Sequence, residues 1–310
     1  MQIYLPIAEL SMNVFFLVGI GGAVGFLSGM FGVGGGFLLT PLLIFSGVPS
    51  PVAVASVTGQ VVASSTSGAL SYYRRNGIDL HLAMYLIMAS TVGSFLGVYT
   101  FGLLRAAGQL DLVIAIAYLL LLGFIGSLML TESVRAILKR RAGVVVRERL
   151  PHQHNWVHGL PWRVRFKRSK LYISVLPVLA IGLCIGFVGA LLGIGGGFIL
   201  VPALVYILRV PGNVVIGTSL LQVVVMMAVT TVLQAVQSQS VDILLAFCLM
   251  VGGTVGAQFG VSAGQYLRGE QLRALLALLV LAIAIRFGLT LVLPPGDVFS
   301  MAVLGPGGLQ

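Results

Sequence analysis

Long apolar runs constrain this sequence more than any other feature. Only 8% of the 310 residues are Asp, Glu, Lys or Arg, whereas a soluble domain carries about 25%. Several runs exceed the ~18 apolar residues that mark a candidate membrane-spanning helix. Because the bilayer core offers no partners for backbone polar groups, we expect these runs to be helical. The sequence therefore predicts an all-α, polytopic membrane protein.

The apolar segments form two sets of five, separated by a basic stretch. The first set occupies residues 12–29, 36–46, 51–71, 80–103 and 110–129. The second set occupies residues 172–190, 197–208, 213–236, 241–262 and 271–292. The second segment of each set is short for a hydrocarbon core of ~30 Å. We expect a first transmembrane repeat at 1–130, a basic linker at 131–171 and a second transmembrane repeat at 172–310.

The two halves match each other in sequence. GFLSGMFGVGGGFLLTP at 25–41 aligns without gaps to GFVGALLGIGGGFILVP at 186–202. Further along, Ser56 aligns with Thr218, and Gln60 aligns with Gln222. This internal duplication predicts that the two halves fold alike, with about five helical segments in each half.

The positive charge is concentrated between the two halves. The net charge is +10, and most of the 18 Lys and Arg residues lie between residues 131 and 170. A basic loop between apolar halves is typical of a cytoplasmic segment that sets membrane topology. We therefore expect membrane lipids and no nucleic acid as partners. With the linker in the cytoplasm, counting crossings places both termini outside.

This topology relates the halves by inversion. The glycine-rich segment of each half forms either two crossings or one re-entrant hairpin, so each repeat crosses the membrane an odd number of times. Inverted repeats with short or broken helices are the architecture of secondary transporters, with a substrate site near the midplane. The alternative is a duplicated scaffold that does not transport.

Two glycine clusters are the strongest candidates for a binding site. They comprise Gly34, Gly35 and Gly36, matched by Gly195, Gly196 and Gly197. Consecutive glycines weaken a helix by up to about 1 kcal/mol each and permit positive φ. We expect a helix break, followed by a short helix that begins near Phe37 or Phe198. The free N–H groups and dipole of such a helix favour a small anion. The alternative role is close helix packing.

Polar residues in the next apolar segment add to this site. Ser56 and Gln60 are four residues apart and share a helical face, as do Thr218 and Gln222. Hydroxyl and amide groups are neutral donors that suit the oxygens of an anion. The alternative role is hydrogen bonding between helices.

Charged residues are rare within the apolar segments. Asp79 and Asp242 lie at predicted helix starts, where an N-cap role is favoured. Arg286 lies well inside a segment, where it would contact substrate, reach the interface or pair with a carbonyl group. We find no intramembrane carboxylate that would serve as a proton or sodium relay.

Nothing in the sequence indicates a cofactor or an enzyme. The linker contains His152, His154 and His158 beside Trp156 and Trp162, which favours an interfacial, lipid-facing segment over a metal site. Neither a buried Ser-His-Asp set nor a Cys-His pair is evident. We expect no metal, no cofactor and no catalytic activity. A membrane enzyme is the less favoured alternative.

The paired motifs at 25–41 and 186–202 resemble those of the TauE/SafE sulfite exporter family. The resemblance extends to the glutamine-bearing helix and to the Thr-Val-Gly motifs at 91–93 and 254–256. It implies a secondary transporter that moves sulfite or small organosulfonates across a prokaryotic cytoplasmic membrane, usually outward. The alternative within transport is ion-coupled import of another small anion.

Overall fold

The computed structural model describes residues 2–31, 34–74, 77–141, 163–166, 171–208, 212–264 and 269–292. These residues are mostly helical, which confirms the all-α prediction. The helices of the first half are α1 (Val14–Phe31), α2 (Gly36–Phe45), α3 (Ser50–Arg74), α4 (Leu80–Ala106) and α5 (Leu110–Arg141).

The second half repeats this order of elements. Its helices are α6 (Val175–Leu192), α7 (Gly197–Tyr206), α8 (Gly212–Leu233), the π-helix η2 (Gln234–Ser238), α9 (Ile243–Gly264) and α10 (Gly269–Val292). Most boundaries lie within a few residues of the predicted segments, because long apolar runs leave little choice of where a spanning helix begins and ends.

Two short antiparallel hairpins were not predicted. β1 (Gln2–Leu5) pairs with β2 (Leu10–Asn13), and β3 (Arg163–Phe166) pairs with β4 (Leu171–Ser174). The sequence of β3 alternates basic and apolar residues, which is the period of a strand. The linker residues His152, His154, His158, Trp156 and Trp162 lie outside the described residues.

Helix α5 extends further than its apolar segment. The apolar run ends near residue 129, but the helix continues to Arg141. Its polar extension contains good helix formers such as Glu132, Ala136 and Lys139. Glycine next occurs at position 143. The beginning of the expected linker is therefore a helical continuation of the first half.

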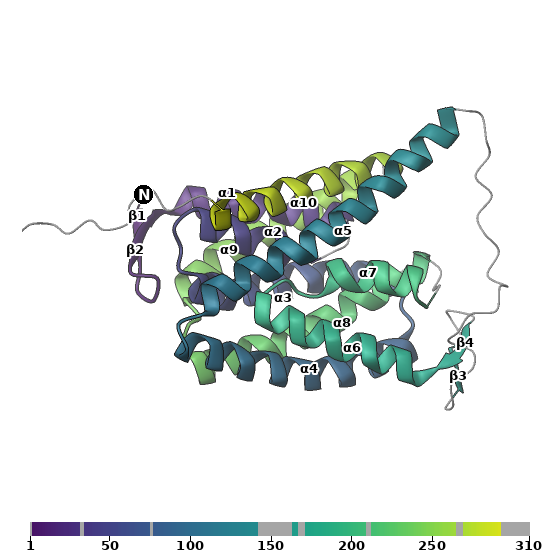
Figure 1. Cartoon of the computed structure of the whole chain (residues 1–310), viewed down its shortest axis with the longest axis horizontal. Helices are drawn as coiled ribbons and strands as arrows, with labels where there is room; N and C mark the ends of the chain where they lie inside the picture. Colours follow the sequence, from purple (N-terminus) through teal and green to yellow (C-terminus); the bar gives the residue numbers. More distant parts are fainter. Residues whose placement is uncertain are drawn as a thin grey trace, which may run out of the picture.

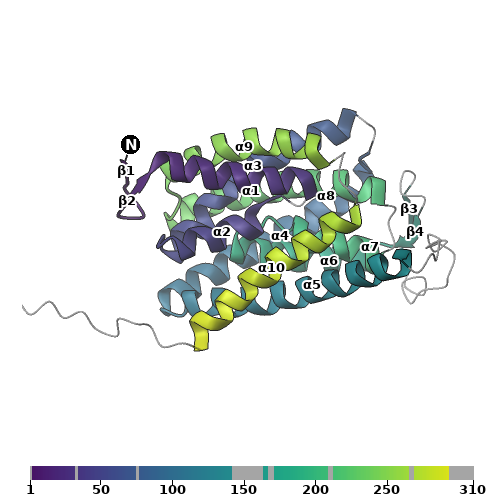
Figure 2. The same cartoon turned by 90° about the horizontal axis from the view of Figure 1, so that it is seen from above.

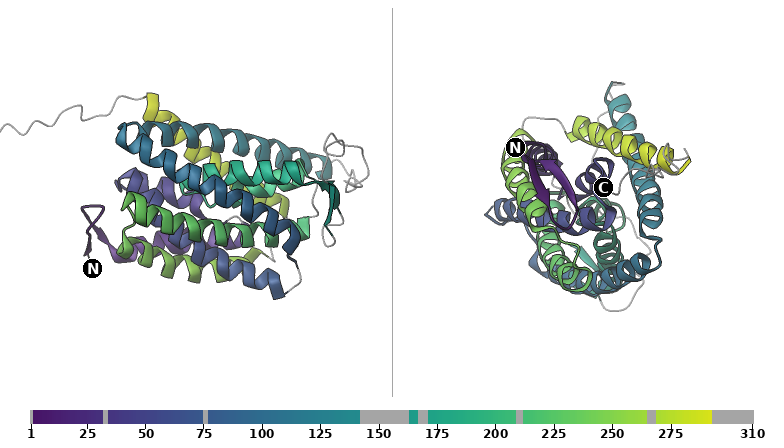
Figure 3. Two further views of the ribbon diagram at one scale, coloured as in Figure 1. Left: turned by 90° about the horizontal axis from the view of Figure 1, so that it is seen from below. Right: turned by 90° about the vertical axis from the view of Figure 1, so that its left-hand side faces the viewer.

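Most of the helices run along the length of the molecule (Figure 1). Six of them pack side by side in the order α6, α4, α8, α3, α9 and α1. Helices α5 and α10 pack against each other and lie together at one side of the bundle (Figure 2; Figure 3, right). Each of these neighbouring pairs joins a helix of the first half to a helix of the second half, so the halves are interlocked.

The packing partners also correspond between the halves. When the halves are aligned, α1 against α9 corresponds to α6 against α4, and α3 against α9 corresponds to α8 against α4. In the pairs α3–α8 and α5–α10, each helix packs against its own equivalent in the other half. Helices α3 and α8 therefore meet at the centre of this arrangement.

Glycines allow the closest of these contacts. The backbone of Gly253 on α9 occupies the space where a Cβ of Gly25 on α1 would lie. The equivalent crossing places the backbone of Ser90 on α4 against Gly186 on α6. Small residues at helix crossings are typical of membrane proteins, where close backbone approach supplies the packing energy.

Six helical segments among the described residues are long and apolar enough to cross a membrane, by length and composition. They are Leu80–Ala106, Leu110–Arg135, Val175–Leu192, Val214–Ser238, Ile243–Ala263 and Ala274–Val292. Helix α3 is more polar, but most of its residues are buried by other helices. Large apolar side chains such as Phe95, Phe124 and Phe259 are exposed on the outer helices. The chain therefore has the build of a multi-pass membrane protein.

Candidate functional site

Each glycine cluster separates two helices, as the sequence predicted. Helix α2 begins directly after Gly34 and Gly35, whose φ angles are 91° and 69°. Helix α7 begins directly after Gly195 and Gly196, whose φ angles are 82° and 71°. Glycine adopts this left-handed conformation without the steric cost that other residues bear. We call these two segments, residues 34–36 and 195–197, the glycine loops.

The short helices present free backbone donors toward the glycine loops. The N-cap positions are Gly35 and Gly196, and neither has a side chain that could cap the helix. Gly196 accepts hydrogen bonds through its carbonyl from the amides of Ile199 and Leu200. In the first loop, the amide of Gly36 donates to the carbonyl oxygen of Gly34 at 2.9 Å, whereas the amides of Gly197 and Phe198 in the second loop have no backbone partner among the described residues. The helix dipole gives each loop a partial positive charge, and the second loop adds these free amides.

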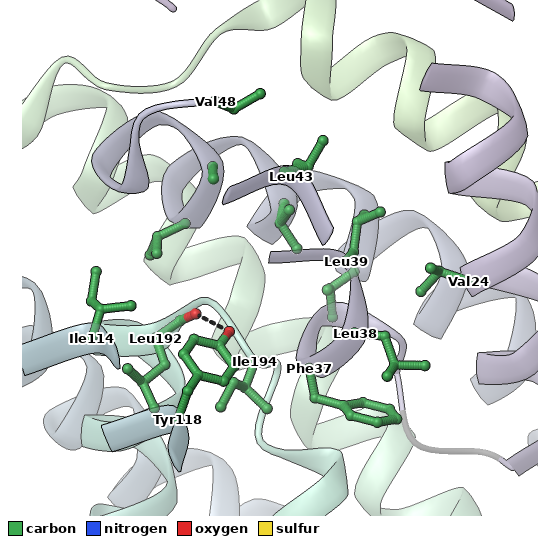
Figure 4. Close-up of a cluster of buried hydrophobic side chains, with 14 of the residues drawn as sticks. Val24, Phe37, Leu38, Leu39, Leu43, Val48, Ile114, Tyr118, Leu192 and Ile194 are labelled. Carbon is green, nitrogen blue, oxygen red and sulfur yellow. Dashed lines mark hydrogen bonds between the residues drawn. The ribbon is translucent and has the colours of Figure 1, made fainter. Parts of the chain in front are cut away.

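The structure brings the two glycine loops together. The rings of Phe37 and Phe198, the residues that follow the loops, stack with their centroids 4.6 Å apart. A Cβ atom at Gly36 would lie 2.5 Å from the carbonyl oxygen of Gly193 and 3.0 Å from the carbonyl carbon of Ile194. Figure 4 shows Phe37 and Ile194 in one buried cluster.

A hydrogen bond from α5 fixes the end of α6, just before the second glycine loop. The hydroxyl group of Tyr118 on α5 donates to the carbonyl oxygen of Leu192 at 2.8 Å, where α6 ends (Figure 4). Both the ring and the hydroxyl group are buried. Tyr118 therefore ties the end of α6 to the opposite half of the bundle.

Two valines from the central helices contact both glycine loops. A Cβ atom at Gly34 would lie 3.7 Å from Val61 Cγ1 and 3.6 Å from Val223 Cγ1. A Cβ atom at Gly195 would lie 2.8 Å and 3.5 Å from the same two atoms. Val61 and Val223 directly follow Gln60 and Gln222, which were predicted to line the site. The sequence therefore predicted the correct turn of each helix, but the side chains that contact the loops are those of the valines.

The glutamines themselves face other neighbours. The side chain of Gln60 occupies the space beside Gly253 of α9, and Gln222 Nε2 donates to Met226 Sδ at 3.2 Å. Both side chains are fully buried. Both amide atoms of Gln60, and Oε1 of Gln222, have no hydrogen-bond partner among the described residues. Such groups are rare in native structures and call for an explanation, such as a ligand or water.

The other two predicted site residues, Ser56 and Thr218, hold the halves together. Ser56 Oγ accepts a hydrogen bond from the amide of Asp242 at 3.0 Å, and Thr218 Oγ1 accepts from the amide of Asp79 at 3.1 Å. All of these groups are buried. The structure therefore places Ser56 and Thr218 at the starts of α9 and α4. Ser56 and Thr218 thus form hydrogen bonds between helices, which was the alternative to substrate binding in the sequence analysis.

The N-cap role predicted for the two aspartates is confirmed. Asp79 accepts from the amide of Leu82 at 3.3 Å, at the start of α4. Asp242 Oδ1 accepts from the amides of Leu244 and Leu245, each at 3.1 Å. These bonds satisfy amides at the start of each helix that have no intrahelical partner.

Arg286 lies away from the glycine loops. Its side chain is exposed, and Cζ lies 4.7 Å from the centroid of the Phe45 ring at the end of α2. This geometry is a cation–π contact. The structure thus shows a contact that the sequence did not predict, an exposed arginine that packs on an aromatic ring.

Comparison with known proteins identifies the family. The sequence matches the family model for the sulfite exporter TauE/SafE over residues 17–287. The chain belongs to the TauE/SafE family. Because the match spans most of the described helices, it includes both glycine loops of this TauE/SafE protein. Among solved protein structures, none matches significantly.

Relatives of this TauE/SafE protein include bacterial and plant proteins. A probable membrane transporter protein of Xylella fastidiosa (strain 9a5c) is 30% identical over 276 residues, covering 86% of this chain and 92% of its own length. The probable membrane transporter protein YunE of Bacillus subtilis is 24% identical over 280 residues, covering 88% and 96%. Sulfite exporter TauE/SafE family protein 3 of Arabidopsis thaliana is 32% identical over 93 residues, 30% of this chain and 20% of that protein.

Proposed function

We propose that this TauE/SafE membrane transporter exports a small oxyanion, sulfite or a small organosulfonate, through the two glycine loops. The observation that carries the proposal is the meeting of two helix N-termini in the buried interior, marked by the Phe37–Phe198 stack. The dipoles of α2 and α7 add their partial positive charges at this point. Neutral donors release an anion more easily than a buried cation would.

Two buried amide groups near the loops offer further neutral donors for an anion. Gln60 has both amide atoms buried without a partner, and it directly precedes a residue that contacts both loops. Adjacent residues of a helix point about 100° apart, so this amide reaches the loops only if α3 rotates or the side chain changes its rotamer. We propose that Gln60 and Gln222 donate to the anion in at least one state of the transport cycle.

Alternating access would come from movement of one half against the other. We propose that residues 1–130 and 172–310 act as inverted repeats, and that the linker at 131–171 lies in the cytoplasm. The correspondence between the packing partners of the two halves supports this arrangement. In such transporters, the repeats rock around a site near the midplane and expose it to each side in turn.

The membrane potential is sufficient to drive export. An anion that leaves a negative-inside cell gains about 2.3 kcal/mol per charge for each 100 mV. Such a mechanism needs no buried acid to couple protons or sodium. We propose that the protein lies in a prokaryotic cytoplasmic membrane, with both termini outside. The bacterial source of two relatives supports the choice of membrane.

The deciding experiment is sulfite flux into liposomes that contain the purified protein. A potassium gradient with valinomycin sets the membrane potential, and protein-free liposomes serve as the control. We expect sulfite flux that reverses direction with the sign of the potential. Flux that requires a proton or sodium gradient instead would contradict the electrogenic mechanism and favour ion-coupled import.

A further inference from the structure

The surroundings of the glycine loops differ between the two halves, although the loops match. The alignment of the halves pairs Ser28 with Gly189 and Ser65 with Met227. In both pairs the first half provides a hydroxyl group, and the second half provides none. The two loops therefore differ in the side-chain donors that surround them.

The first loop has hydroxyl groups on two sides. A Cβ atom at Gly34 would lie 3.3 Å from Ser65 Oγ, and a Cβ atom at Gly35 would lie 3.3 Å from Ser28 Oγ. Ser65 is only 1% exposed, and its hydroxyl group has no hydrogen-bond partner among the described residues. Ser65 follows Val61 by four residues on α3, so both side chains share the helical face that contacts the loops.

The second loop is lined by apolar groups at the equivalent places. A Cβ atom at Gly189, which aligns with Ser28, would lie 2.7 Å from the methyl group of Met226 and 3.5 Å from that of Met227, and a Cβ atom at Gly196 would lie 3.6 Å from the same Met226 methyl group. Met226 and Met227 are both fully buried. Met227 follows Val223 by four residues on α8, which matches the placement of Ser65 after Val61. A thioether has no hydrogen to donate to an anion.

We infer that the side-chain hydroxyl groups that bind the oxygens of the anion come from the first half alone, from Ser28 and Ser65 beside the first loop, while Met226 and Met227 form an apolar wall opposite. This inference rests on the proposed function, since it assigns the orientation of the anion within that site. Ser65 becomes a residue that determines specificity, and Met227 becomes its apolar counterpart.

A one-sided site selects anions by the distribution of their oxygens. Sulfate carries oxygens on every side, so at least one would face methyl groups without a donor. An unpaired buried oxygen costs about tenfold or more in affinity. Methanesulfonate carries its oxygens on one side and a methyl group on the other. The site therefore prefers methanesulfonate to sulfate.

Binding measurements on the purified full-length protein test this orientation. Calorimetric titration with methanesulfonate, sulfite and sulfate compares the wild type with Ser65→Ala and Met227→Ser. Thr66→Val is the matched control, because Thr66 is the next residue on α3, is exposed and bonds only to its own helix. Thermal unfolding without ligand is measured for each variant.

We expect Ser65→Ala to weaken methanesulfonate binding about tenfold, without lowering the unfolding temperature, because its hydroxyl group has no protein partner to lose. Met227→Ser should raise the affinity for sulfate relative to methanesulfonate. If Ser65→Ala binds like the Thr66→Val control, the inference is wrong while the proposed function stands. If the wild-type protein binds none of the three anions, both the inference and the proposed function are wrong.

Discussion

The rings of Phe37 and Phe198 lie nearly parallel, with an angle of 9° between their planes. The two residues occupy equivalent positions in the halves and follow the two glycine loops directly. Both side chains are almost completely buried. The stack therefore fixes the distance between the starts of α2 and α7, and hence between the two sets of backbone donors.

Removing one ring should loosen this contact. We expect Phe37→Ala to lower the free energy of unfolding by about 3–5 kcal/mol, because a large buried side chain leaves a cavity. Phe198→Ala should have a similar effect. The double variant should cost less than the sum of the two by about 0.5–1.5 kcal/mol, the usual coupling of an aromatic pair. Thermal unfolding in detergent measures all three, and fully additive effects would contradict a direct coupling.

A side chain at Gly36 should separate the glycine loops. A Cβ atom there would lie 2.5 Å from the Gly193 carbonyl oxygen and 2.7 Å from Val61 Cγ2, so one of the loops must move. We expect Gly36→Ala to abolish most sulfite flux in liposomes. The control is Gly123→Ala on α5, where no atom lies within 4 Å of the added group. Normal flux in Gly36→Ala would show that the contact between the loops is dispensable.

The sequence predicted the helices and the loops well because those features depend on local properties. Apolar length fixes the spanning helices, and runs of glycine fix the breaks at Gly34 and Gly195. The N-cap role of Asp79 also follows from its position before an apolar segment. None of these requires knowledge of which helices become neighbours.

The directions of the side chains could not be predicted in the same way. Gln60 and Val61 are adjacent in the chain, yet one lies beside α9 and the other contacts the glycine loops. Ser56 bonds to Asp242, 186 residues away. These contacts depend on the register between helices of different halves, which no local pattern encodes. For the same reason, the relation of Ser65 to Gly34 became visible only in three dimensions.

The bonds of Ser56 and Thr218 across the halves should contribute to stability. Each hydroxyl group accepts from a buried backbone amide, and that amide would be left unpaired by substitution. We expect Ser56→Ala and Thr218→Ala each to lower the free energy of unfolding by about 1–3 kcal/mol. The control is Thr100→Ala, whose hydroxyl group bonds to its own helix at an exposed position. An unchanged free energy of unfolding together with weaker sulfite binding would contradict this structural role and support a role in binding the substrate.

The effect of replacing Gln60 with leucine separates a structural from a substrate-binding role. Gln60 is fully buried, and neither atom of its amide group has a partner among the described residues. Leucine is of similar size and removes the cost of burying this amide, which is about 1–3 kcal/mol. Gln60→Leu should therefore be at least as stable as the wild type in thermal unfolding. We also expect sulfite flux to fall by about tenfold or more, because the anion loses a donor in the transport cycle. A variant that gains stability and keeps full flux would show that the amide group does not contact the anion.

Gln222→Leu provides the matched test in the second half. Gln222 Nε2 already bonds to Met226, so we expect a smaller gain in stability there.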